Sequence, residues 1–106
     1  MEQLLKDTPT TLLSSAGTTG AGSIFAFPAT ATQATWQAVY GTTPSSITTL
    51  IEGSMDGVTF NTIDSSTVTA GAIRSFVACP AYIRANVSAI GSTTTQTTIV
   101  VMIAKQ

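Results

Sequence analysis

In 106 residues the chain carries four Lys or Arg, five Asp or Glu and no His, so charged residues make up only 8% of it and the net charge is −1. Four dispersed cations cannot form the basic patch that phosphate binding needs, which excludes a nucleic-acid partner. No apolar run reaches the roughly 18 residues that span a membrane, and no signal-peptide pattern opens the sequence, so we expect no membrane partner and synthesis in the cytoplasm.

The first nine residues differ from the rest, and we expect them to form a short N-terminal arm. Charged side chains stand there among Met1, Leu4 and Leu5, and Pro9 discourages a helix longer than one turn. In an assembly such an arm often reaches a neighbouring subunit, while the alternative is a frayed terminus. Residues 10–106 then form one domain, because a chain of this length suits a single hydrophobic core.

From Thr10 onward, β-branched stretches alternate with separators rich in Gly, Ser, Thr and Pro, such as residues 17–22. Short strands punctuated about every 8–12 residues are typical of a β-sandwich or barrel. We predict an all-β fold, an antiparallel β-sandwich or jelly roll with a short N-terminal arm. One sequence does not decide between jelly-roll and immunoglobulin-like strand order. The expected strands are 10–16, 23–28, 34–40, 46–54, 58–64, 72–78, 81–90 and 96–104.

Alternation within the strands predicts which side chains face the core. In the strand 46–54, Ile47 and Ile51 fall on one face, and Glu52 falls on the other, in an outward position. The last strand is apolar on both faces from Ile99 to Ile103, which indicates a central strand or one that packs on a partner. In the strand 81–90 the shared inward face consists of Ile83, Ala85, Val87 and Ala89.

The segment between 46–54 and 58–64 contains Asp56-Gly57, which is a strong turn signal. Glycine accepts a positive φ, and the aspartate side chain caps the turn. We therefore predict a hairpin over residues 46–64. Cys79 is the only cysteine, so no intrachain disulfide is possible, and its apolar neighbours predict a small buried side chain.

The residue types for common catalytic chemistry are missing. Without histidine and with one cysteine, the chain cannot build a zinc site or a Cys–His nucleophile, and no serine or phosphate-loop motif is present. The turn accounts for Asp56, and an outward strand position accounts for Glu52. We expect a protein that is not an enzyme, with no catalytic residues, no metal and no cofactor.

Three segments resemble a pattern in small structural proteins of tailed bacteriophages, of the decoration or cement type. These segments are residues 35–40 (TWQAVY), 51–63 (IEGSMDGVTFNTI) and 80–91 (PAYIRANVSAIG), followed by a final strand rich in Val and Ile. The resemblance implies a β-sandwich or jelly roll and a place in the virion. The hairpin segment is also similar to that of discoidin-type carbohydrate-binding domains.

This resemblance and the low charge together predict a capsid decoration protein. It would be made in the bacterial host cytoplasm, lie on the capsid surface of the virion, and stabilise the phage head lattice. Its partners would be the major capsid protein and copies of itself, in a trimer or a dimer. The expected contact residues are Met1, Leu4, Leu5, Thr10, Thr11, Val100 and Met102.

The alternative function is a carbohydrate-binding or adhesion module displayed on the virion, on a head fibre or the tail. Sugar binding uses exposed aromatic rings for stacking and amides for hydroxyl groups. The residues that could serve are Trp36, Tyr40, Tyr82 and Asn86. Aromatic side chains on strands are, however, more often part of a core.

Overall fold

The computed structural model describes residues 10–13, 19–27, 32–41 and 43–91 and the backbone of residues 98–105. All regular structure in these residues is β, and all strand pairings are antiparallel, which confirms the predicted all-β fold. The strands are β1 (Thr10–Leu13), β2 (Gly20–Ala21), β3 (Phe25–Ala26), β4 (Gln33–Tyr40), β5 (Ile47–Ser54), β6 (Asn61–Ser66), β7 (Ala72–Val77), β8 (Tyr82–Ile90) and β9 (Thr98–Lys105).

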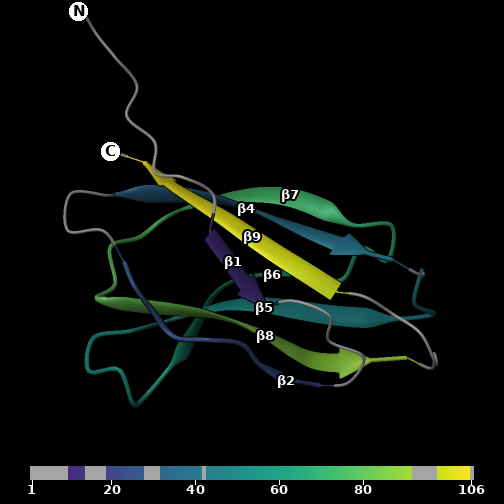
Figure 1. The fold of residues 1–106 in the computed structure, drawn as a ribbon, viewed down its shortest axis with the longest axis horizontal. Helices are drawn as coiled ribbons and strands as arrows, with labels where there is room; N and C mark the ends of the chain where they lie inside the picture. The colour runs from purple at the N-terminus through teal and green to yellow at the C-terminus, as the bar shows by residue number, and fades with distance from the viewer. Residues whose placement is uncertain (1–9, 14–18, 28–31, 42, 92–97, 106) are drawn as a thin grey trace, which may run out of the picture.

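The strands form two sheets (Figure 1). Sheet I has the order β1-β9-β4-β7, and sheet II has the order β2-β8-β5-β6. β3 also pairs with β8, so β2 and β3 together border one side of that strand. β5 and β6 pair as a hairpin, as the Asp56-Gly57 signal predicted.

The hydrophobic core lies between the two sheets and draws on both. Trp36 of β4 and Phe76 of β7 come from sheet I, and Ile51 of β5 and Ile83 of β8 come from sheet II. Because successive side chains of a strand point to opposite faces, alternate residues supply this core. Burying a side chain of this size contributes about 1.5–3 kcal/mol relative to exposure, and Trp36 is only 1% exposed.

The predicted inward face of β8 holds for three of its four residues. Ile83, Ala85 and Val87 are fully buried, but Ala89 is exposed. The register between β5 and β8 shifts at this point, since Thr48 pairs with Ala89 while Thr49 pairs with Val87. An extra residue in one strand reverses the alternation beyond it, so the prediction for Ala89 was wrong.

Two elements near the N-terminus differ from the prediction: β3 holds only two residues, and β2 lies within a segment assigned to a separator. β1 covers the first part of the predicted strand 10–16, whose remainder lies outside the described residues. Gly20 in β2 has a φ of 148°, which side chains rarely adopt, and a two-residue strand offers no alternation to detect. The pairing of β2 with β8 therefore leaves no signal in the sequence.

Candidate functional site

The hairpin tip between β5 and β6 is built around Asp56. Its Oδ1 accepts hydrogen bonds from the backbone N–H of Val58 and of Thr59, both at 2.8 Å, and from the Ser54 hydroxyl at 2.8 Å. Gly57 takes the positive φ of 76° that the turn requires. The bonds from Thr59, Val58 and Ser54 lower the pKa of Asp56 from 3.8 to about 2. This carboxylate is occupied by the turn, as the sequence predicted.

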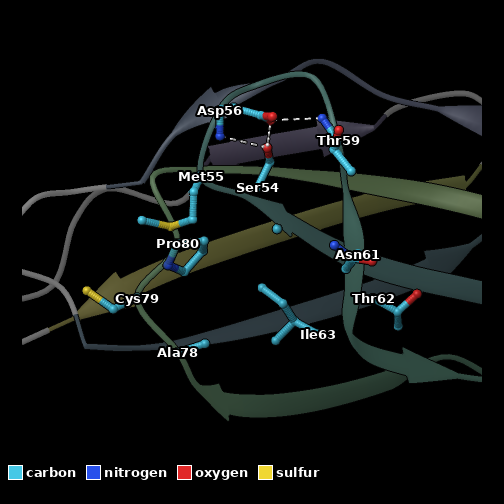
Figure 2. A pocket seen from close by; sticks show the side chains of 11 residues that line it. Ser54, Met55, Asp56, Thr59, Asn61, Thr62, Ile63, Ala78, Cys79 and Pro80 are labelled. Atoms are coloured by element: carbon cyan, nitrogen blue, oxygen red, sulfur yellow. Dashed lines mark hydrogen bonds between the residues drawn. The ribbon is translucent and has the colours of Figure 1, made fainter.

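An open depression of about 450 Å³ lies beside this tip. Figure 2 shows the hydrogen-bonded Asp56 turn at one side of it and the segment 78–80, which joins β7 to β8, at the other. Met55 is 74% exposed, and Cys79 is exposed as well. The prediction that Cys79 is buried was wrong, because Phe76 and Ala78 pack against the core, whereas Val77 and Cys79, at the alternate positions, are exposed.

A polar cluster lies on the outer face of sheet II. The Arg84 guanidinium donates to the Glu52 carboxylate at 2.7 Å, and the Asn86 amide donates to the other Glu52 oxygen at 3.3 Å. The Phe60 ring covers Arg84, with the guanidinium carbon 4.1 Å from the ring centroid. Glu52 points outward from sheet II, as its strand position predicted, but these neighbours bury it and leave 8% of its surface exposed.

Three polar contacts join the two sheets. The Trp36 indole N–H donates to Asp64 Oδ2 at 2.9 Å, and Arg74 forms an ion pair with Asp64 at 3.0 Å. The hydroxyl groups of Tyr40 and Thr49 lie 2.9 Å apart. Burial raises the pKa of Asp64, but the hydrogen bonds from Arg74 and Trp36 hold it below 3.8.

Of the four residues considered for sugar binding, these contacts leave only two available. Trp36 is buried and Tyr40 bonds across the core, so neither presents a ring for stacking. Tyr82 and Asn86 share the outer face of β8 with Arg84, and Tyr82 is 36% exposed. The structure thus brings together only two of the four candidates, next to an ion pair whose groups already have partners.

The outer face of sheet I has a different character. On β4 and β7 the side chains that point away from the core are uncharged, and the hydroxyl groups of Thr35 and Ser75 pair there at 2.8 Å. Ile73 and Val77 are 66% and 83% exposed. We call this surface the sheet I face; its described residues on β4 and β7 are Gln33, Thr35, Gln37, Val39, Ile73, Ser75 and Val77.

The predicted contact residues lie partly outside the described part of the chain. This is true of Met1, Leu4 and Leu5, and of the side chains of Val100 and Met102. Thr10 is half-buried and Thr11 exposed on β1, which pairs with β9. The backbones of Thr10 and Met102 are directly paired, so the structure does bring these two segments together.

The outer residues of β4 and β7 were not predicted as a contact surface. Their signal was the alternation itself, since the positions between the buried residues of β4 and β7 hold Thr, Gln, Ser, Val and Ile and no charge. That pattern becomes a surface only when β4 and β7 are known to be neighbours.

The lowered pKa values predict a loss of stability in acid. A carboxyl group with a lowered pKa stabilises the fold above its unfolded-state pKa, and this contribution disappears as the pH falls through the folded-state pKa. The pKa values of Asp56 and Asp64 are both lowered from 3.8. We expect the free energy of unfolding, measured by urea and Trp36 fluorescence, to be level above about pH 5 and to decline from about pH 4 to 2.

The Asp56→Asn variant is the control for this decline. It removes one of the two carboxyl groups with a lowered pKa, so its free energy of unfolding should depend less steeply on pH in the acid range. An identical profile in the parent and the variant would contradict the assignment of the decline to Asp56.

The described residues contain no group of three or more His, Cys, Asp or Glu side chains placed to hold a metal ion. Nor do they include a helix with the length and apolar character to cross a membrane.

Comparison with known proteins shows a likeness in fold. No protein-family model and no curated protein matches the sequence. Among solved structures, the SPBc2 prophage-derived protein YomS superposes with a TM-score of 0.78 at 13% sequence identity, over 100% of this chain and 97% of that chain. At this identity the likeness shows the fold alone. The antiparallel β fold of this chain is therefore one that also occurs in a prophage-derived protein.

Proposed function

We propose that this chain is a virion structural protein, a capsid decoration (cement) protein that binds the phage head lattice and stabilises it. The observation that carries the proposal is the sheet I face, whose described side chains on β4 and β7 are all uncharged. A contact made by such a face buries no unpaired charge, so it avoids the desolvation cost that charged groups incur. The two packed sheets suit a β-sandwich, and the likeness to a prophage-derived protein adds support.

The mechanism is mechanical. The protein is made in the host cytoplasm and settles on the assembled head, where one face bridges neighbouring copies of the major capsid protein. Binding to the assembled lattice and not to separated subunits stabilises the lattice by mass action. No catalytic step, metal or cofactor takes part in this process.

The test is binding of the purified protein to heads of the phage that carries its gene, measured by cosedimentation. We expect binding that persists in 1 M NaCl, where the Debye length is about 3 Å and surface charge pairs are screened. Bound heads should also resist heat better than bare heads. No binding to heads, together with absence of the protein from virions, would overturn the proposal.

A matched pair of variants locates the contact. Gln37→Lys adds a charge at an exposed position on the sheet I face, and Val58→Lys adds one at the hairpin tip, where Val58 is 81% exposed. We expect Gln37→Lys to weaken head binding by about tenfold or more, because the lysine must be desolvated. Val58→Lys should bind like the parent. Equal binding by both variants would place the contact elsewhere.

The alternative, a carbohydrate-binding module, retains two of its four residues on one surface. A broad glycan array distinguishes it from the decoration protein. Binding to a glycan that is lost in Tyr82→Ala, without any binding to heads, would favour the alternative.

A further inference from the structure

The strand β7 forms one edge of sheet I, and it differs from the other sheet edges. The register of β1 with β9 is interrupted between Thr11 and Leu13, and that of β6 with β5 is interrupted between Ile51 and Glu52. β2 and β3 contribute two residues each. β7 pairs with β4 over six residues without a register shift, so among the described edges it is the longest regular one.

An open edge presents a row of backbone N–H and C=O groups that fits another extended strand. Proteins usually protect such edges with charged side chains, proline or a bulge. β7 has no proline and no bulge, and its one charged side chain, Arg74, is paired with Asp64 of sheet II. In addition, Ile73 and Val77 stand exposed beside this edge.

We propose that β7 is a self-association edge, where a second copy of this chain adds its own β7 antiparallel to form one continuous sheet across the dimer. This inference does not depend on the proposed function. A twofold axis through such a pair places one residue opposite its own copy, and the chemistry of β7 selects which residue that is.

The register centred on Ser75 fits the side chains. It places each Ile73 opposite Val77 of the second copy, so all four exposed aliphatic side chains meet on the same face. It also places Arg74 opposite Phe76. A register centred on Arg74 would oppose two like charges, which destabilises a cross-strand pair. A register centred on Phe76 would leave Ile73 without an aliphatic partner, because β7 ends at Val77.

The strand β7 is complementary to itself, since Ile73 of each copy meets Val77 of the other. For this reason we infer that a second copy of the chain occupies the edge. An unrelated strand would have to supply aliphatic residues at two matching positions and no charge between them. A second β7 supplies both by symmetry, which is the property of an isologous twofold interface.

The first experiment measures molar mass by light scattering over a dilution series, without capsids present. We expect a dimer for the parent, and a dissociation constant raised by about tenfold or more in Val77→Lys, since two aliphatic pairs are lost per dimer. Val58→Lys is the matched control, because Val58 and Val77 are 81% and 83% exposed. It should remain a dimer. A parent that is monomeric or trimeric, or a Val77→Lys variant that dimerises like the parent, would overturn the proposal.

The second experiment tests the register by a disulfide. Residues directly opposite in an antiparallel pair have Cα atoms about 4.5–5.5 Å apart, within the range that a disulfide spans. In a Cys79→Ser background, which removes the native thiol, Ser75→Cys should form a covalent dimer on mild oxidation. Val58→Cys in the same background should not. A dimer that Ser75→Cys fails to link would show that another surface or register makes the contact.

Discussion

Replacing Asp64 by alanine is expected to lower the free energy of unfolding by about 2–3 kcal/mol. Asp64 accepts the hydrogen bond of the Trp36 indole N–H, and Trp36 is 1% exposed, so this buried donor depends on the carboxylate for its hydrogen bond. A buried donor left without an acceptor costs about 1–3 kcal/mol. The loss of the half-exposed Arg74 ion pair adds little. Urea unfolding followed by the fluorescence of this single tryptophan measures the change.

Arg74→Gln is the control for this prediction. It removes the ion pair but leaves the bond between Trp36 and Asp64 in place, so we expect a clearly smaller loss than in Asp64→Ala, because exposed ion pairs stabilise little. Equal losses in the two variants would show that the ion pair, and not the indole bond, stabilises the contact between the sheets. A loss below about 1 kcal/mol in Asp64→Ala would show that Trp36 finds another acceptor.

Local sequence patterns predicted most of the strands, because alternation and turn chemistry are local properties. β4, β5, β7 and β8 agree with the predicted ranges to within about a residue at each end, within the usual scatter of assigned boundaries. The Asp56 turn has the side-chain capping and the positive φ at Gly57 that its two residues indicated.

Features that depend on partners distant in the sequence were not predictable. Glu52 is buried because Arg84, 32 residues later, pairs with it and Phe60 covers Arg84. The indole of Trp36 bonds to a carboxylate 28 residues away in the other sheet. Side-chain burial at these positions is a property of the sheet order, and strand order does not follow from alternation.

The candidate surface, too, could be predicted only in part from the sequence. The scarcity of charge in the composition predicted an assembly role, but not the location of the contact. The antiparallel pairing of β4 with β7 gathers the uncharged positions into the sheet I face. The charges of β4 to β8 lie away from this face: Asp64 and Arg74 bridge the sheets, and Glu52 and Arg84 pair on the outer face of sheet II.

That second pair yields the other large expected effect. Arg84→Met is expected to lower the free energy of unfolding by about 3 kcal/mol. Glu52 is 8% exposed and accepts a 2.7 Å hydrogen bond from Arg84, so the variant leaves a buried carboxylate with only the longer bond from Asn86. Methionine packs well against an aromatic ring, so contact with Phe60 is largely retained and the loss reports the unpaired charge.

The double variant Glu52→Leu with Arg84→Met separates the unpaired charge from the packing. If the cost of Arg84→Met comes from stranding Glu52, removing both charges should restore stability to within about 1 kcal/mol of the parent, because a buried ion pair and an apolar pair of similar size are often equivalent. A double variant whose loss of stability equals the sum of the losses in Glu52→Leu and in Arg84→Met would contradict this. That result would mean that Arg84 stabilises the fold through Phe60, as an anchor that holds the hairpin segment after Asp56 against sheet II. In either case the effect stays on sheet II, so self-association through β7 should be unchanged in each of these Glu52 and Arg84 variants that folds.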